Sequence, residues 1–566
     1  MSLNQVTKEA LNLADPYIRI EQTFPTLSDE QVERCKRFGH IESLKKGTLL
    51  FERGDRSVDF FVVLDGTIEV YEHKYQELNV FRAHQKHQFT GELDHLSDRK
   101  VLVGARMGED GTVIRMVRSQ FKQFMASEPD IAEIMMRAFI LRRIGLITHG
   151  LGTVTLIVSR ECPDSIRLER FIRRNGYPVE ILDYETSRVN HPCLDALGIS
   201  KEKLPAVFIN QGVQLLFNPS NLELAENLGL SETLEPGHCY DLAIVGSGPA
   251  GLSAAVYAAS EGLDVILLES EAPGGQAGTS SKIENYMGFP NGVSGQELAT
   301  RAQIQAQKFG ARLALPTEID RIQCDVRPFE LTTQNDASFK ANNVIIATGA
   351  HYRRLGFEHP YDNAGVYYAA TPMEANLCQG DDVIVVGGGN SAGQAAVFLA
   401  GRTRFVHMLI RGNELASGMS EYLVSRITSS HNIAVYNNTE IIDLKGAHLL
   451  EEVTWRNQLT EEIETRPIRY VFLMLGALPN TTWLDGYLSL DEHGFIHTGM
   501  SLIENRQWTE SRYPLMLETS VPGIFAVGDV RSGSIKRVAS AVGEGAMAVT
   551  HIHEFRSTIS KELVKI

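Results

Sequence analysis

The first part of the chain, about residues 1–148, alternates apolar and polar positions in short stretches. The sequence KKGTLLFERGDRSVDFFVVLDGTIEVYEH, which starts at Lys45, shows this alternation with breaks at Gly47, Gly54 and Gly66. Such alternation between glycine turns predicts the short antiparallel strands of a small barrel. In SQFKQFMASEPDIAEIMMRAFILRRIGLI the apolar positions change to helical spacing, which predicts a capping or connecting helix.

A second pattern covers about residues 150–232. TVTLIVSR is a β-rich run, and it leads into a segment where Ile166, Leu168, Phe171 and Ile172 lie at helical spacing. VEILDY then predicts another strand, and KLPAVFINQGVQL predicts a hairpin-like pair of strands. The order predicts a small α/β unit.

The third pattern begins at about residue 238 with DLAIVGSGPAGLSAAVYAASEGLDVILLES. An apolar strand runs into Gly246, Gly248 and Gly251, a small-residue helix follows, and a second strand ends at Glu269. The glycines allow a tight turn and a close approach of a pyrophosphate to the helix N-terminus, and the acid can bind the ribose 2′-hydroxyl. Strand, turn, helix and acid together predict a dinucleotide site.

A similar unit recurs in DDVIVVGGGNSAGQAAVFLAGRTRFVHMLIRG. Gly387, Gly389 and Ala392 repeat the turn, but the second strand ends at Arg411 rather than at an acid. Because an arginine can pair with a 2′-phosphate, the second nucleotide is predicted to be NADPH rather than NADH. Two dinucleotide folds in one catalytic unit imply that a hydride passes from nicotinamide to flavin.

The composition of the chain limits the kinds of partner that we expect. The formal net charge is −16 and no block is rich in Lys or Arg, which argues against a nucleic-acid surface. No apolar run is long enough to span a bilayer and the N-terminus has no signal pattern, so we expect a cytoplasmic protein with no membrane partner. The cysteines are scattered at positions 35, 162, 193, 239, 324 and 378. Since they form no CxxC pair, we predict neither a close-spaced zinc site nor a vicinal dithiol, and no metal site.

Longer motifs in the third segment carry a family resemblance. The stretches PGGQAGTSSKIENYMGFPNGVSGQELATRAQIQAQKFGA, VIIATGAHYRRLG, FLMLGALPN and GIFAVGDVRSGSIKRVASAVGEGAMA resemble the bacterial, low-molecular-weight thioredoxin reductases. The resemblance implies an α/β fold with two Rossmann-like domains and a homodimer. It places an FAD domain at 238–352 and 477–566, interrupted by an NADPH domain at 353–476, with FAD and NADPH as cofactors.

The resemblance also implies site residues. Those expected at the FAD are Gly246, Gly248, Pro249, Ala250, Gly251, Glu269, Gly274, Gly275, Gln276, Asn285, Thr348, Gly349, Gly528, Asp529, Lys536, Arg537 and Val538. Those expected at the NADPH are Gly387, Gly389, Asn390, Ser391, Ala392 and Arg411. Where the family has a glutamine beside the flavin this chain has Arg537, which would favour an anionic reduced flavin. Gly412 replaces a second family arginine, which predicts a weaker preference for NADPH.

One departure from the family bears on the electron path. In the family, the dithiol motif Cys-Ala-Thr-Cys precedes the first strand of the NADPH domain. At the corresponding positions this chain has Ala369, Ala370, Thr371 and Pro372. Neither alanine nor proline can exchange a disulfide, so the usual exit for electrons is absent at both cysteine positions. Cys378 follows alone and is expected in the core.

The first segment, 1–148, resembles a cyclic-nucleotide-binding domain. The resemblance implies that Gly91 and Glu92 bind a cyclic phosphate and its ribose. The family's phosphate-binding arginine is missing, because Val101 and Leu102 lie near its place and Arg99 comes about two residues early. The segment is therefore expected to bind a cyclic nucleotide or another ligand, or to act as a docking module.

The second segment, 150–232, resembles a thioredoxin or glutaredoxin-like domain. Cys162 stands where that family places its active cysteine at a helix N-terminus, and a cis-proline is expected at Leu204-Pro205. A helix N-terminus favours a thiolate, although Glu161 and Asp164 oppose it. Ser165 replaces the second cysteine, so only a mixed disulfide could form there.

Three functions remain open. In the first, the chain transfers a hydride from NADPH to FAD and passes the electrons to an unknown acceptor, a protein or a small molecule. In the second, Cys162 swings to the flavin and restores thioredoxin-disulfide reductase-like activity. In the third, the chain is a sensor of ligand and redox state whose output is conformational.

Overall fold

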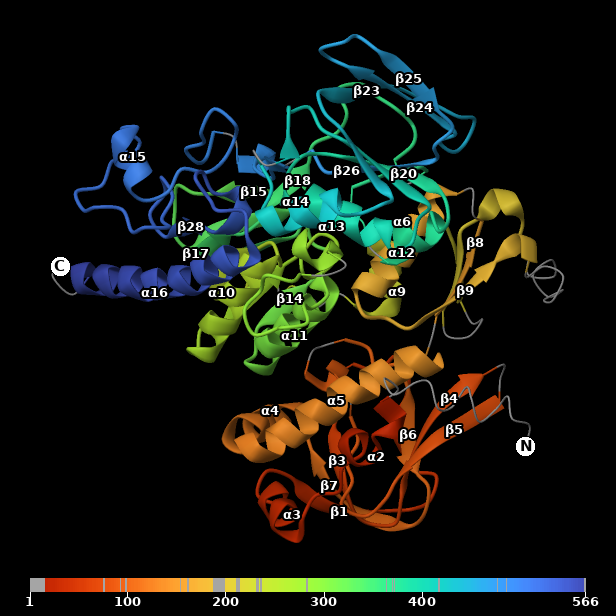
Figure 1. The fold of residues 1–566 in the computed structure, drawn as a ribbon. Coiled ribbons are helices and arrows are strands. Elements are labelled where there is room, and N and C mark those ends of the chain that lie inside the picture. The colour runs from red at the N-terminus through yellow and green to blue at the C-terminus, as the bar shows by residue number, and fades with distance from the viewer. Residues whose placement is uncertain are drawn as a thin grey trace. The chain divides into compact units, whose positions relative to one another are not determined.

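The computed structural model describes residues 16–563 except 57, 75–76, 92, 97–98, 153, 160–161, 187–198, 210–213, 231–233, 235–236, 281–282, 363, 369, 371, 416–417, 476 and 485. The chain forms two compact units. The first comprises Met1–Ser159, Leu168–Thr233 and Gln307–Pro316, and the second comprises Arg160–Arg167, Leu234–Ala306 and Thr317–Ile566. Figure 1 shows the elements of both units.

The first unit contains the antiparallel strands that the alternation predicts. One sheet has the order β1-β7-β3, with β1 (His40–Leu44), β7 (Gly111–Met116) and β3 (Phe60–Asp65). The other has the order β2-β6-β4-β5, with β2 (Leu49–Phe51), β6 (Gly104–Met107), β4 (Ile68–Lys74) and β5 (Glu77–His84). The helical segments are η1 (Pro16–Ile18), α2 (Ile20–Thr23), α3 (Asp29–Cys35), η2 (Leu93–Leu96), α4 (Arg118–Ser127) and α5 (Pro129–His149). Stacked and edge-on rings of Phe60, Phe89, Phe121 and Phe139 join strand to helix in the core.

The same unit holds the predicted small α/β element. Its sheet has the order β11-β10-β8-β9, with β8 (Val154–Val158) parallel to β9 (Val179–Asp183). The antiparallel pair is β10 (Ala206–Ile209) and β11 (Gln214–Phe217), and the Leu204–Pro205 peptide bond is cis, as expected. The helical segments are α6 (Pro163–Arg174), η3 (Lys201–Lys203) and α9 (Asn221–Leu228). The first turn of α6 is grouped with the second unit.

The second unit begins with a sheet in which β13 (Val265–Leu268), β12 (Cys239–Val245), β17 (Ser338–Ile346), β16 (Phe329–Thr333) and β15 (Ile319–Gln323) are adjacent in that order. β28 (Ile524–Ala526) pairs in parallel with β17. Helix α10 (Pro249–Ser260) follows β12 and packs against the last helix, α16 (Val538–Leu563) (Figure 1). After η5 (Ala277–Thr279), α11 (Gly295–Lys308) precedes the short strand β14 (Arg312–Ala314).

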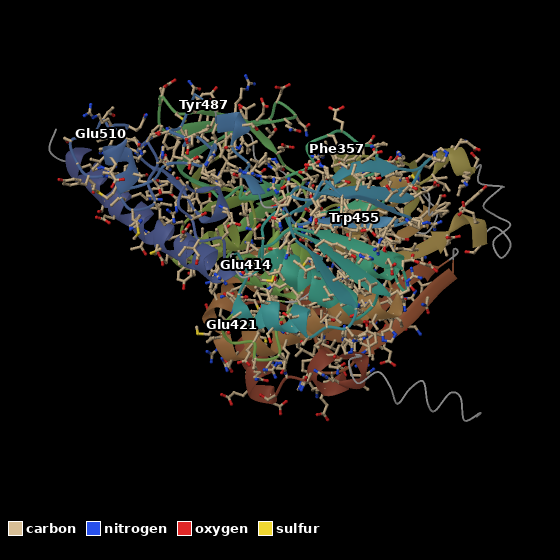
Figure 2. All side chains as sticks on the ribbon, turned by 45° about the horizontal axis from the view of Figure 1, so that its top comes forward. Phe357, Glu414, Glu421, Trp455, Tyr487 and Glu510 are labelled. Atoms are coloured by element: carbon tan, nitrogen blue, oxygen red, sulfur yellow. The ribbon has the colours of Figure 1, made fainter. Side chains whose placement is uncertain are left out.

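A second parallel sheet has the order β19-β26-β20-β21-β22. Its strands are β19 (Val366–Tyr367), β26 (Tyr470–Leu473), β20 (Asp382–Val386), β21 (Phe405–Leu409) and β22 (Ile433–Tyr436). The helices are α12 (Pro372–Leu377), α13 (Asn390–Ala400) and α14 (Glu421–Thr428). A three-stranded antiparallel sheet, β23 (Thr439–Lys445), β24 (Glu452–Asn457) and β25 (Ile463–Arg466), shares an apolar cluster with the parallel sheet, and Trp455, labelled in Figure 2, belongs to that cluster.

The chain passes twice between the two large sheets. β18 (Ala350–Tyr352) and β27 (Ala477–Pro479) form an antiparallel pair at these crossings, next to the predicted domain boundaries. The remaining elements are η7 (Thr482–Leu484), α15 (Met500–Glu504) and η8 (Gly528–Val530). Within the described ranges no helix has the length and apolar character required to cross a bilayer, and no group of His, Cys, Asp or Glu side chains is placed to hold a metal ion.

Candidate functional site

The turn between β12 and α10 contains three glycines with different surroundings. Gly246 has φ +104°, and an added Cβ would lie 2.4 Å from the carbonyl oxygen of Ala347. A Cβ on Gly251 would lie 1.9 Å from the carbonyl oxygen of Gly246. Gly248, the residue that precedes α10, has φ −67°, and its Cβ would meet nothing within 4 Å. Gly246 and Gly251 are therefore required by the packing of the chain itself, whereas Gly248 leaves open space at a helix N-terminus.

The predicted acid, Glu269, follows β13 and is held against this turn. Its Oε2 atom accepts hydrogen bonds from Ser247 N at 2.9 Å and from Ser247 Oγ at 2.6 Å. Its Oε1 atom accepts a bond from the backbone N–H of Glu271 at 3.0 Å. A carboxylate has about four acceptor sites, so lone pairs remain for a ribose hydroxyl.

The Gly274–Gly275 segment packs against the same turn. Gly274 N donates to the carbonyl of Ser247 at 2.8 Å, and a Cβ on Gly275 would lie 3.1 Å from the Cα of Gly248. Gln276 and Asn285 are exposed. The two glycine-rich stretches, far apart in sequence, are thus brought together as the predicted FAD site requires.

Thr348 and Gly349 form bonds that the sequence analysis missed. Thr348 Oγ1 donates to the carbonyl of Asn480 at 2.9 Å, and Asn480 Nδ2 donates to the carbonyl of Thr348 at 2.8 Å. Asn480 N also donates to the carbonyl of Gly349 at 3.1 Å. Asn480 therefore joins the two chain crossings, and its position at the end of the motif FLMLGALPN was the available signal.

The Gly528–Asp529 turn is held by α16. Gly528 N donates to Glu544 Oε2 at 2.7 Å, and Arg531 Nη2 donates to Glu544 Oε1 at 2.5 Å. Burial raises the pKa of the Asp529 carboxyl, and the charge of Lys536 opposes this shift. Sequence reasoning missed Glu544 and Arg531, although GEGAMA, which contains Glu544, lies in a quoted motif.

The residues after this turn are more exposed. Lys536 Nζ lies 4.2 Å from the centroid of the Phe495 ring, and Arg537 is exposed. Val538 begins α16. The effect of Arg537 on a reduced flavin remains a prediction.

The second glycine turn joins β20 to α13. Gly387 has φ +140°, and its Cβ would lie 2.3 Å from the carbonyl oxygen of Met474. Gly389 is the N-cap of α13, and Asn390 Oδ1 accepts a bond from Ser420 N at 2.7 Å. Ser391 is exposed in the first turn of the helix, whereas Ala392 is buried. Arg411 is exposed just beyond β21, beside Ile410.

The residues at the positions of the family dithiol contain no sulfur. Ala370 is buried in an apolar cluster and Pro372 is exposed at the start of α12, while Ala369 and Thr371 lie outside the described residues. Cys378 is fully buried and its Sγ donates to the carbonyl of Glu374 at 3.3 Å. Burial raises the pKa of the Cys378 thiol to about 12, so it stays protonated at neutral pH. The expectation that Cys378 belongs to the core is confirmed.

Cys162 is half-buried immediately before α6. Its carbonyl accepts a bond from Ser165 N at 3.1 Å, which places it at the helix N-terminus, as predicted. Residues Arg160–Arg167 belong to the second unit, where Ile166 packs against the apolar cluster that contains Ala370 and Cys378. Glu161 and Cys193 lie outside the described residues.

In the barrel, Gly91 has φ +105°, and Glu92 lies outside the described residues. Arg99, the nearest candidate for a phosphate-binding arginine, is buried and donates from Nη1 to the carbonyl of Asn175 at 3.4 Å. Val101 and Leu102 are buried. The guanidinium of Arg99 thus interacts with the end of α6, and apolar side chains occupy the place where the family has its arginine.

Family models match two parts of the chain. The model described as pyridine nucleotide-disulphide oxidoreductase matches residues 240–545, and the model described as cyclic nucleotide-binding domain matches residues 41–128. The chain is 34% identical over 324 residues to the thioredoxin reductase of Chlamydia trachomatis serovar D, covering 56% of this chain and 97% of that protein. It is 32% identical over 320 residues to the thioredoxin reductase of Ureaplasma parvum serovar 3, covering 56% of this chain and 96% of that protein.

Solved structures match the same part. The Lactococcus lactis thioredoxin reductase superposes with a TM-score of 0.50 at 29% identity, covering 56% of this chain and 98% of that chain. The T. acidophilum thioredoxin reductase superposes with a TM-score of 0.50 at 30% identity, covering 57% of this chain and 99% of that chain. These matches confirm the predicted α/β fold with thioredoxin-reductase-like Rossmann domains.

Proposed function

Since this chain belongs to the pyridine nucleotide-disulphide oxidoreductase family and is a flavoprotein oxidoreductase that uses FAD and NADPH, we propose that its electrons leave by a route other than a Cys-Ala-Thr-Cys dithiol. When bound, the two cofactors supply hydride transfer from nicotinamide to flavin. The protein then delivers the electrons to an external acceptor, a small molecule or a protein.

The segment from Ala370 to Cys378 carries this proposal. Ala370 and Pro372 have no sulfur, and the Cys378 thiol is buried with its pKa raised to about 12. A thiol that stays protonated is a poor nucleophile towards a disulfide. An acceptor that takes electrons directly from the flavin fits these residues better than a bound disulfide does.

The residues of the two turns fit the cofactors. Gly248 leaves open space at the N-terminus of α10, where N–H groups and the helix dipole favour a pyrophosphate. Glu269 is positioned to accept a ribose hydroxyl, and Glu544 fixes the Gly528–Asp529 turn. Ser391 in the first turn of α13 is proposed to bind the NADPH pyrophosphate.

Acceptor choice tests the proposal. The purified protein is reduced anaerobically with NADPH, and the recovery of flavin absorbance is followed after adding ferricyanide, a quinone or a disulfide. We expect rapid recovery with ferricyanide or the quinone in both the wild type and Cys162→Ser. Recovery of flavin absorbance only with the disulfide, and only in the wild type, would contradict the proposal. If NADPH did not bleach the flavin at all, the result would instead favour a sensor.

One observation favours a second candidate function. The first turn of α6, which follows Cys162, packs through Ile166 against the apolar cluster of which Ala370 is also a member. In this candidate, the thiolate of Cys162 attacks a small-molecule disulfide, so that one thiol leaves and a mixed disulfide with Cys162 forms. Two electrons, which a bound reduced flavin would supply, and protons from solvent would then return the Cys162 thiol and release the second small thiol. The Cys162→Ser variant in the experiment above separates the two candidates.

Arg411 is expected to set the preference for NADPH. It is exposed beyond β21, where a 2′-phosphate would come to lie if the nucleotide follows the glycine turn. Replacing it by glutamine removes a charge-assisted contact, so the ratio of kcat/KM for NADPH to that for NADH should fall about tenfold. Arg402, exposed just beyond the C-terminal end of α13, gives the control: Arg402→Gln should leave the ratio unchanged. An unchanged ratio in Arg411→Gln would remove Arg411 from the site.

The surface between α10 and α11 is proposed to join two copies of the chain. A cavity of about 320 Å³ lies there, lined by Leu252, Tyr257, Phe289 and Leu298 among others. Apolar groups at such a surface are stabilised when a partner covers them. Light scattering should give about twice the chain mass of 62.8 kDa, and a monomer would contradict the homodimer. The cytoplasmic location stays a prediction, which cell fractionation checks.

A further inference from the structure

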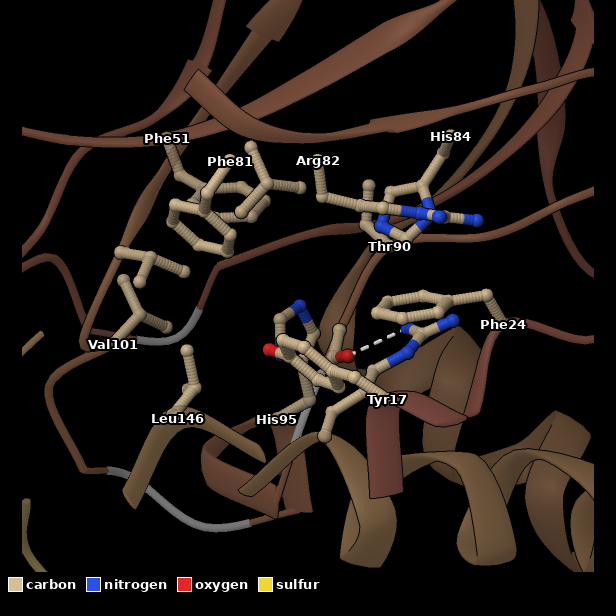
Figure 3. A pocket seen from close by; sticks show the side chains of 14 residues that line it. Tyr17, Phe24, Phe51, Phe81, Arg82, His84, Thr90, His95, Val101 and Leu146 are labelled. Carbon is tan, nitrogen blue, oxygen red and sulfur yellow. Dashed lines mark hydrogen bonds between the residues drawn. The ribbon is translucent and has the colours of Figure 1, made fainter. Parts of the chain in front are cut away.

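The barrel in the first unit contains a cavity that is apolar at one end. The cavity has a volume of about 40 Å³ and is lined by residues of β4, β5 and α5 and by Thr90, Gly91, His95, Val101 and Val103. Figure 3 shows Phe51, Phe81, Val101 and Leu146 together on one side of it. These four side chains cannot form hydrogen bonds, so a polar group placed among them would lose its hydrogen bonds to water without replacement. A ligand that reaches this side must therefore present an apolar group to it.

The other end of the cavity carries nitrogen atoms. Arg82 and His84, both on β5, lie there beside Phe24, as Figure 3 shows. His84 is 2% exposed, and neither its Nδ1 atom nor the Nε atom of Arg82 has a hydrogen-bond partner in the described part of the chain. Burial lowers the pKa of His84 well below its usual value, so this imidazole is neutral and Arg82 carries the charge. Thr90 Oγ1 is already the acceptor for Phe61 N at 3.0 Å.

The charge of Arg82 is not balanced by the lining. The lining residues that the structure describes include no Asp or Glu. The second arginine, Arg142, donates from Nε to the carbonyl of Thr23 at 2.9 Å and from Nη1 to the carbonyl of Gly91 at 2.8 Å, so it holds the barrel together. Because the Arg82 guanidinium is partly removed from solvent, its pKa is lowered. A half-buried cation without a counter-ion is stabilised by an anionic ligand.

The size of the cavity limits that anion. At about 40 Å³ it lies far below the roughly 300–1,000 Å³ typical of sites for drug-sized ligands. It is also smaller than an engineered cavity of about 150 Å³ that holds benzene. A cyclic nucleotide, with its purine, ribose and phosphate, exceeds this space. The phosphate-binding arginine of the cyclic-nucleotide-binding family is absent as well, because Val101 and Leu102 lie near its place.

From these features we infer that the barrel binds a monocarboxylate of one or two carbons, formate or acetate, in place of a cyclic nucleotide. The carboxylate accepts hydrogen bonds from Arg82 Nε and His84 Nδ1, and the methyl group of acetate lies towards Phe51, Phe81 and Val101. This inference is independent of the route by which electrons leave the flavin.

Calorimetric titration of the full-length protein tests it. The probes are formate, acetate, propionate, butyrate and hexanoate, with acetamide as the uncharged match of acetate and with cyclic AMP and cyclic GMP. We expect formate or acetate to bind most tightly and affinity to fall from propionate to hexanoate, since the cavity of about 40 Å³ has room for about three or four non-hydrogen atoms at roughly 10–15 Å³ each. Acetamide should bind at least about tenfold more weakly than acetate, because it lacks the charge that Arg82 pairs with.

Variants locate the site. Arg82→Gln should weaken acetate binding at least about tenfold, whereas Arg137→Gln, at an exposed position on α5 paired with Glu133, should bind acetate like the wild type. Should Arg82→Gln fail to fold, the comparison of acetate with acetamide in the wild type still tests the inference. Equal affinity for acetate and acetamide, acetate binding that Arg82→Gln leaves intact, no carboxylate binding, or binding of a cyclic nucleotide would each overturn the inference.

Discussion

Replacing Gly248 by valine should leave the chain folded and remove its ability to retain FAD. The backbone of Gly248 has φ −67° and ψ −177°, a conformation open to any residue, and a Cβ there would meet nothing within 4 Å. The branched side chain would fill the space through which a pyrophosphate approaches the N-terminus of α10. We expect FAD affinity to fall about a hundredfold or more, which corresponds to roughly 3 kcal/mol. The ratio of flavin to protein absorbance after gel filtration measures the loss.

Gly543→Val provides the matched control. Gly543 is exposed on α16, its Cβ would also meet nothing within 4 Å, and it lies outside the glycine turn. This variant should retain FAD as the wild type does, and both variants should have the far-ultraviolet circular dichroism of the wild type. Full retention of FAD by Gly248→Val would show that the pyrophosphate does not cross this turn.

The second large effect is expected at Glu544, a buried acid that holds the Gly528–Asp529 turn. Its carboxylate accepts bonds from Gly528 N and from two nitrogen atoms of Arg531. Glu544→Gln keeps the shape but leaves the partly buried charge of Arg531 without a counter-ion, which costs about 3 kcal/mol in comparable cases. The temperature at which FAD is released, followed by flavin fluorescence, should fall by roughly 5–10 °C.

Glu492→Gln is the control for this change. Glu492 is an exposed acid that pairs with the neighbouring His493, so loss of its charge should change stability by less than about 0.5 kcal/mol. If Glu544→Gln and Glu492→Gln released FAD at the same temperature, the Arg531–Glu544 pair would contribute nothing to the turn.

Periodic features of the sequence predicted much of the fold. The strand–turn–helix–strand unit around Gly246 was predictable because β12 and β13 are short apolar runs on either side of a helix whose glycines can occupy only a few backbone conformations. The second glycine turn, at Gly387, was predictable for the same reason. The burial of Cys378 was predictable from its place on the approach to an apolar strand.

Contacts between distant residues were not predictable. Asn480 joins Thr348 across 132 positions, and Glu544 binds Gly528 N across 16 positions, so no local pattern marks either pair. The partner of Arg99 is the carbonyl of Asn175, on a segment that the sequence assigned to a separate module. Sequence spacing shows that Arg99 lies about two residues before the position of the family's phosphate-binding arginine. Only the fold shows which group Arg99 binds.

The central claim is that FAD is the only group in the chain that stores electrons from NADPH, and anaerobic titration with dithionite tests it most directly. The number of equivalents needed to bleach the flavin fully is counted against the bound FAD. We predict about one two-electron equivalent per FAD, since the flavin alone accepts the electrons. A requirement of about two equivalents per FAD would mean that a disulfide is reduced together with the flavin, and this result would contradict the claim.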